Sequence, residues 1–149
     1  MRKAVTIAFG LFALVASIGT ARADDNRELV QMPAMMQQHM LASMRDHLAT
    51  LGEITADLSA EKYDAAGKVA EERLGLSSFE LHGAAHMAGY MPKPMQEAGT
   101  ALHRASSRFA IAAQDADVDR SYESMKKLHT ALNDMLSACN ACHSGYRIR

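Results

Sequence analysis

Several absences limit what this chain can be. It has only two cysteines, Cys139 and Cys142, too few for a structural zinc site built from two cysteine pairs. No segment shows the two-residue alternation of apolar and polar side chains that predicts a β-strand. Basic side chains are not in excess over acidic ones, 16 against 17, so a polyanion such as a nucleic acid is not an expected partner.

The first 23 residues have the pattern of a signal peptide. Arg2 and Lys3 give a positive start, residues 5–18 form an apolar run, and Ala-Arg-Ala at 21–23 forms a small-x-small cleavage site. The run is too short for a permanent membrane span, and no later stretch approaches that length. We therefore expect a periplasmic protein that has no membrane anchor after cleavage.

The rest of the chain, residues 24–149, is long enough for one domain with one core. Because Arg2, Lys3 and Arg22 belong to the first segment, this part carries 13 basic and 17 acidic side chains, a formal charge of −4. If its partners are charged, we expect them to present basic patches.

Apolar residues return every three or four positions in four stretches, as amphipathic helices require. The expected helices cover about 33–58, 62–73, 94–116 and 120–146, the last one with an N-cap within 117–119. Leu48, Tyr122 and Leu136 are expected to face the core. Because most connections are short, we expect an all-α, antiparallel four-helix bundle, in which a cofactor lies between facing helices.

Cys139 and Cys142 lie near the end of the last helix and are followed directly by His143. Thiols at this spacing share one helical face, so they can add to the two vinyl groups of a haem, and the histidine can bind the iron. A redox dithiol usually opens a helix after a strand, whereas this pair ends a helix. A plain disulfide fits an exported protein but gives no role to His143. The motif therefore predicts one covalently bound haem c per chain.

With this motif in place, the chain resembles the class II c-type cytochromes, the family of cytochrome c-prime and its low-spin relatives. The resemblance covers the whole of residues 24–149, and its specific part is Cys-x-x-Cys-His-x-x-Tyr-Arg at 139–147. It implies that Cys139 and Cys142 carry thioether bonds, that His143 is the proximal ligand and that Arg147 lies near the proximal pocket. One departure is that the family's early Arg-Gln pair, whose arginine lies near a haem propionate, corresponds here to Met-Met-Gln-Gln at 35–38.

The residue on the distal side of the haem separates two groups of this family. The resemblance implies an apolar residue of the first helix there in five-coordinate, gas-binding members, and a methionine ligand in electron-transfer members. Here Met36, Met40 and Met44 form a stripe on the first helix, which ordinary core packing also explains. We expect Met40 or Met44 to bind the iron, since a thioether with an imidazole gives low-spin haem with a raised reduction potential.

These expectations describe an electron carrier with redox protein partners and no catalytic residues, and so not an enzyme. One alternative is a five-coordinate cytochrome c-prime that binds NO or CO. A second alternative is a copper-binding haem protein, because methionines and histidines crowd residues 32–44 and 82–95 and suit Cu(I). The resemblance also predicts a homodimer, for which the first helix offers Met35 and Leu41 outside its main stripe.

Overall fold

The computed structural model describes residues 24–80 and 83–149, so the predicted signal peptide at 1–23 lies outside the described residues. Most of the described chain is helical, which confirms the all-α class. The helices are α1 (Ala34–Ser59), α2 (Tyr63–Leu74), the short 3-10 helix η1 (Leu76–Ser78), α3 (Ala84–Ala88), α4 (Lys93–Val118) and α5 (Tyr122–Gly145). The described helices include none long and apolar enough to cross a membrane.

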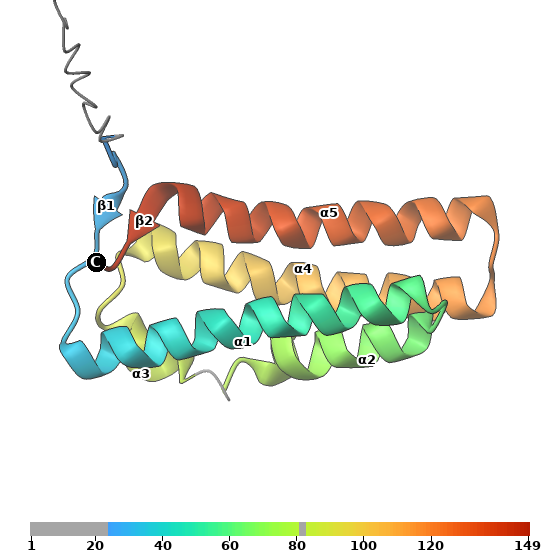
Figure 1. The fold of residues 1–149 in the computed structure, drawn as a ribbon, viewed down its shortest axis with the longest axis horizontal. Coiled ribbons are helices and arrows are strands. Elements are labelled where there is room, and N and C mark those ends of the chain that lie inside the picture. Colours follow the sequence, from blue (N-terminus) through green and yellow to red (C-terminus); the bar gives the residue numbers. More distant parts are fainter. Residues whose placement is uncertain (1–23, 81–82) are drawn as a thin grey trace, which may run out of the picture.

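The four long helices α1, α2, α4 and α5 lie side by side along the long axis of the molecule (Figure 1). Their packing follows the chain order, with α1 against α2, α2 against α4, and α4 against α5. The described residues show no comparable packing between α1 and α5. The helix array is therefore open along the side where α1 faces α5.

The main core forms around α4, which contributes more buried side chains than any other helix. Phe109 of α4 is fully buried, as are Leu74 of α2 and Leu128 and Met135 of α5. On α1 the buried residues are Thr50 and Ile54, although Leu51 and Leu58 also pack against this core. Helix α1 is therefore the long helix with the fewest buried anchors.

Three residues predicted to face the core, Leu48, Tyr122 and Leu136, are exposed instead, and Leu136 is the least exposed of them at 39%. Leu48 is 71% exposed, because α1 packs extensively on α2 alone and part of its apolar stripe stays uncovered. Tyr122 is 85% exposed, because it is the first residue of α5 and the helix reaches the core only at Met125. The predicted stripes have the correct period. The prediction of burial was wrong where no neighbouring helix covers the stripe.

The N-cap of α5 is Ser121, two residues after Asp119 and four after Asp117, the aspartates that the sequence favoured. The Ser121 hydroxyl accepts a hydrogen bond from the Ser124 amide at 3.2 Å, as an N-cap does. Asp119 holds this serine in place, because its carboxylate accepts from the Ser121 amide at 3.2 Å and from the Ser121 hydroxyl at 2.9 Å. Asp119 therefore supports the cap without being the cap.

The described chain also has two very short strands that the sequence did not predict. Strands β1 (Glu28–Leu29) and β2 (Tyr146–Arg147) pair in parallel, and the Val30 amide donates to the Arg147 carbonyl at 2.8 Å. Residues 24–32, called the N-terminal strap below, thereby lie beside the end of α5 and next to the C-terminus (Figure 1). Strands of two residues are too short for an alternating pattern to reveal.

Candidate functional site

The last turns of α5 bring the three residues of the predicted haem motif together. Cys139 and Cys142 are both free thiols and half-buried, and His143 is exposed. Burial raises the pKa of both thiols, so each carries its proton at neutral pH. The site thus offers two protonated thiols that face apolar surroundings and a neighbouring imidazole that is open to a ligand.

The two cysteines contact different apolar clusters. Cys139 packs against the main core, whereas Cys142 packs against a second cluster at the end of the molecule. This end cluster has four buried residues, Val30, Met32, Met87 and Met95, and six partly buried ones, Met36, Met40, Met91, Cys142, Tyr146 and Ile148. The motif therefore lies where the main core ends and a methionine-rich apolar region begins.

The end cluster brings α1 methionines to the motif although they lie about 100 residues away in sequence. Met36 and Met40 pack in the same cluster as Cys142. Met44 is half-buried one turn further along α1 and is not among the members of that cluster. Of the two predicted distal ligands, Met40 is thus the one that shares surroundings with the cysteine motif.

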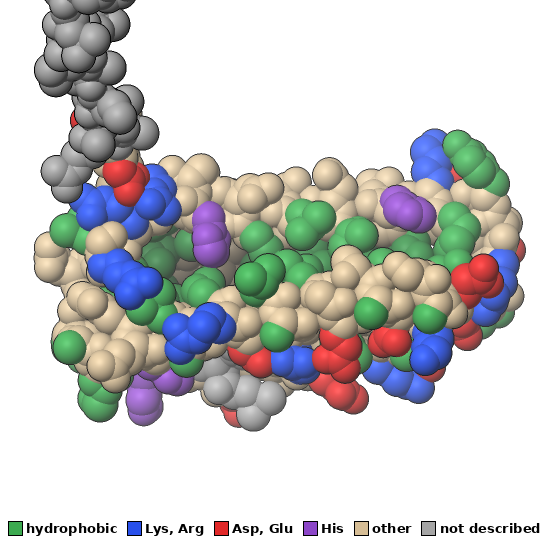
Figure 2. All heavy atoms as spheres, in the orientation of Figure 1, with side chains coloured by type: hydrophobic (Ala, Val, Ile, Leu, Met, Phe, Trp, Pro, Cys, Tyr) green, Lys and Arg blue, Asp and Glu red, His purple; other side chains and the backbone are tan. Residues whose placement is uncertain are grey.

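A hollow lined by hydrophobic side chains runs between α1 and α5 on the face shown in Figure 2. It follows the seam along which these two helices do not pack extensively. The two helices beside it carry half-buried residues, among them Met40 and Met44 of α1 and Leu132 and Cys139 of α5. This face of the molecule therefore presents apolar surface along the seam between α1 and α5.

Arg147 supplies a positive charge beside the motif. Its Nε atom is buried and has no hydrogen-bond partner in the described structure, although the Asp25 carboxylate lies 3.7 Å away. Asp25 is already held by Arg27, whose Nε and Nη2 atoms donate to it at 2.8 and 2.7 Å. A buried guanidinium nitrogen that makes one long ion pair and no hydrogen bond suits a further anionic group such as a haem propionate. These residues fit haem in donor set, apolar surface and charge.

Asp25 and Arg27 connect the strap to the motif electrostatically. The hydrogen bonds from Arg27 lower the pKa of Asp25 from 3.8 to about 2, against the opposing effect of desolvation. Arg27 also reaches the backbone carbonyl of His143, to which its Nη1 atom donates at 3.4 Å. The strap thus contacts the residue that is predicted to bind the iron.

The described residues offer no conventional site for a free metal ion. They contain no group of three or more His, Cys, Asp or Glu side chains placed to hold one. His39 and His86 are exposed, and the third histidine of the predicted copper-binding segments, His82, lies outside the described residues. A copper site in the described part of the chain would have to use the methionines.

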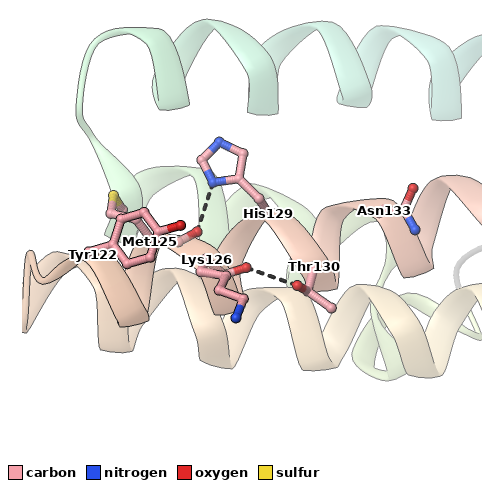
Figure 3. A pocket seen from close by; sticks show the side chains of 6 residues that line it. All are labelled: Tyr122, Met125, Lys126, His129, Thr130 and Asn133. Atoms are coloured by element: carbon pink, nitrogen blue, oxygen red, sulfur yellow. Dashed lines mark hydrogen bonds between the residues drawn. The ribbon is translucent and has the colours of Figure 1, made fainter.

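A shallow depression elsewhere on α5 does not resemble a cofactor site (Figure 3). Its lining comes entirely from the first half of α5: Tyr122, Met125, Lys126, His129, Thr130 and Asn133. Two of these polar side chains are satisfied locally, because His129 Nδ1 lies 2.7 Å from the Met125 carbonyl oxygen and the Thr130 hydroxyl donates to the Lys126 carbonyl at 2.9 Å. His129 precedes His143 by about 21 Å of helix, so this depression is separate from the motif.

Sequence reasoning named every residue of the motif but missed the strap. Asp25 and Arg27 carry no spacing that predicts a role, since they act through contacts with residues more than 110 positions away. The signal that was present is the apolar content of Leu29, Val30 and Met32 just after the expected cleavage site. Comparisons of the chain with protein-family models, curated proteins and solved structures gave no match.

Proposed function

We propose that this protein is a periplasmic c-type cytochrome of the class II kind, which carries electrons on one covalently bound haem. The observation that carries the proposal is the end cluster, against which Cys142 of the motif and Met36 and Met40 of α1 all pack. A Cys-x-x-Cys-His motif alone predicts attachment, whereas this cluster adds a thioether donor from the facing helix. The signal-like pattern of residues 1–23 supports the periplasmic location.

The attachment chemistry suits the thiols of this site. Each cysteine S–H adds across one vinyl C=C of haem, the sulfur forming a C–S bond and the hydrogen going to the other carbon. The addition loses no atoms and needs no oxidant, and it requires both thiols to be reduced and free, as Cys139 and Cys142 are here. Arg147 then has an anionic partner for its buried Nε atom.

The axial donors of the chain explain why we favour electron transfer. His143 is exposed on α5 and available as one donor, and Met40 on α1 is our choice for the other. Haem, when bound, supplies a one-electron couple whose potential rises with a methionine ligand. In our proposal both donors hold the same positions in the two oxidation states, which suits fast electron exchange and leaves no position open for a substrate.

We further propose that α1, α2, α4 and α5 act as an antiparallel four-helix bundle closed by the haem. Bundles bind cofactors between facing helices, and here α1 and α5 are the facing pair that lacks extensive packing of its own. In the proposed arrangement, haem fills part of that seam near Cys142. The apolar side chains on its two sides support this interpretation.

The visible spectrum of the reduced protein tests the function most directly. Sharp α and β bands indicate six-coordinate low-spin iron and an electron carrier, whereas a broad high-spin band that changes with CO indicates the gas-binding alternative. A denaturing gel stained for peroxidase activity tests attachment: the wild type should stain, and a Cys139→Ala, Cys142→Ala variant should not. A Ser137→Ala variant, changed at an exposed position of the same helix, is the matched control and should stain as the wild type does. An unstained wild-type chain expressed with haem-attachment machinery would overturn the proposal.

A further inference from the structure

The end cluster is unusually rich in sulfur for an apolar core. Six of its ten residues are methionines, and Cys142 adds a seventh sulfur atom. The main core of the same protein has twenty apolar residues, of which Met125, Met135 and Cys139 contain sulfur. Methionine is therefore not the general packing residue of this chain, because alanine and leucine fill most of the main core.

The proposed haem uses only part of this sulfur. In the proposed haem site, one half-buried methionine of α1 would be the further iron ligand besides His143. Met32, Met87 and Met95 remain, and they are the buried methionines of the cluster, with exposed fractions of 7%, 3% and 6%. They come from the strap, from α3 and from the first turn of α4, so the fold brings three distant segments together at this end of the molecule (Figure 1).

Three buried thioethers match the preference of one metal ion in particular. Thioether sulfur is a soft and neutral donor that selects Cu(I) over Zn²⁺, Mg²⁺ or Ca²⁺. The described residues offer no cluster of His, Cys, Asp or Glu side chains that would favour those harder ions. Met91, Met36 and Met40 pack against this cluster and are more exposed than the three buried methionines. We propose that the end cluster binds Cu(I) through Met32, Met87 and Met95.

This proposal is independent of the haem assignment, because it uses other side chains and another metal. The experiment is an anaerobic competition for Cu(I) between the purified protein without residues 1–23 and bicinchoninate, a coloured Cu(I) chelator. The wild type should withdraw one Cu(I) per chain from the chelator. Leucine conserves the volume of methionine, so Met32→Leu, Met87→Leu and Met95→Leu should each keep the fold and weaken Cu(I) binding by about tenfold or more.

Matched controls separate this site from methionine in general. Met35→Leu changes an exposed methionine and Met125→Leu changes one in the main core, and neither should alter the competition. X-ray absorption of the copper-loaded protein should show sulfur neighbours only. The proposal is wrong if the wild type withdraws no copper, if the three leucine variants bind as tightly as the controls, or if nitrogen neighbours dominate the absorption spectrum.

Failure of the haem proposal would leave this test readable. The visible spectrum reports haem in the same samples, and the Cys139→Ala, Cys142→Ala chain can be titrated in the same way. Copper binding by the Cys139→Ala, Cys142→Ala chain, which has neither haem nor free thiols, supports the thioether site, and haem without copper binding overturns it. Circular dichroism of each leucine variant identifies any loss of fold, and the remaining single variants then decide.

Discussion

At the residue scale, the α1 methionines differ in their surroundings more than their spacing suggests. Met36, Met40 and Met44 follow one another at four-residue intervals, so a helical wheel treats them alike. The structure separates them, because Met36 and Met40 pack against the same end cluster as Cys142, and Met44 is not a member of that cluster. The fold thereby adds a ranking that the sequence could not provide.

We predict that Met40 is the distal iron ligand. Met40→Leu should convert low-spin to high-spin iron, allow CO to bind and lower the reduction potential, since the thioether favours the reduced state. Leucine keeps the volume, so the loss of stability should stay below about 1.5 kcal/mol. Visible spectra and redox titration measure both effects.

The neighbouring methionines are the controls for this prediction. Met36→Leu and Met44→Leu should keep the low-spin spectrum and the wild-type potential. A low-spin spectrum in Met40→Leu together with a high-spin one in Met36→Leu or Met44→Leu would move the ligand to that position. A low-spin spectrum in all three variants would exclude the α1 methionines.

Asp25 gives a second prediction at this scale, because its contacts tie the strap to the motif. Its pKa is lowered from 3.8 to about 2, chiefly by the hydrogen bonds from Arg27. Because its pKa is lower in the folded protein, the ionised Asp25 stabilises the folded contact at pH values above its ordinary pKa. This contribution is lost as the pH falls through the lower pKa of the folded state. The strap should therefore stay docked at pH 4 and loosen as the pH falls towards about 2.

Nuclear magnetic resonance can follow this change at the Val30 amide, which donates to the Arg147 carbonyl. In Asp25→Asn the amide signal should lose its low-pH transition and resemble the loosened strap already at neutral pH. Glu28→Gln, which changes an exposed carboxylate of the same strap, should keep the wild-type transition. A wild-type midpoint near 4 would show that Arg27 does not hold Asp25 in solution.

At the element scale, a polar network attaches the turn that follows α2 to helix α4. Ser107 of α4 donates to the Glu71 carboxylate at 2.5 Å, and the Ser77 hydroxyl and amide donate to it at 2.6 and 3.1 Å. Desolvation opposes ionisation, and these hydrogen bonds outweigh it, so the pKa of Glu71 lies below its usual 4.5. The Glu71 carboxylate thus accepts a hydrogen bond from the Ser77 amide of η1.

We predict that Glu71→Gln lowers the free energy of unfolding by about 1 kcal/mol at pH 7, because the amide keeps only part of these bonds. Because its pKa is lowered by folding, the ionised Glu71 stabilises the fold at pH values above its unfolded pKa. This stabilisation is lost as the pH falls through the lower pKa of the folded state. The difference between wild type and variant should therefore shrink at pH 3. Urea unfolding at both values measures it, and Glu72→Gln, at the exposed neighbouring position, should show no such pH dependence.

The long helices were predictable from the sequence, and the elements that complete the site were not. Apolar periodicity located α1, α2, α4 and α5, because each presents an apolar stripe to a neighbour. The same periodicity misplaced Leu48, since a stripe indicates which side is apolar and not whether another helix covers it. The motif at Cys139, Cys142 and His143 could be read directly because its spacing is local. The strap, the end cluster and the buried Nε of Arg147, which makes no hydrogen bond, depend on contacts between residues far apart in the chain. A single sequence has no signal for such contacts.

At the scale of the whole molecule, the fold distributes its stability unevenly. Helix α4 has buried residues along most of its length, whereas the buried residues of α1 are Thr50 and Ile54 in its second half. The first half, from Ala34 to His47, has half-buried and exposed side chains only. If haem fills the seam between α1 and α5, it covers the part of α1 that the protein itself covers least.

This asymmetry gives a prediction that links the fold to the cofactor. In the Cys139→Ala, Cys142→Ala chain, the backbone amides of residues 34–47 should exchange with deuterium much faster than in the haem-loaded wild type. Residues 50–58 should change less, because Ile54 and its neighbours stay in the main core, and the amides of α4 should stay protected in both proteins.

Hydrogen–deuterium exchange with mass spectrometry resolves these segments as separate peptides. A Ser137→Ala protein with haem attached is the matched control, and its exchange should equal that of the wild type. Equal protection of residues 34–47 with and without haem would mean that haem does not rest against α1. That result would leave His143 as the axial ligand supplied by this chain and would remove the structural basis for a methionine ligand.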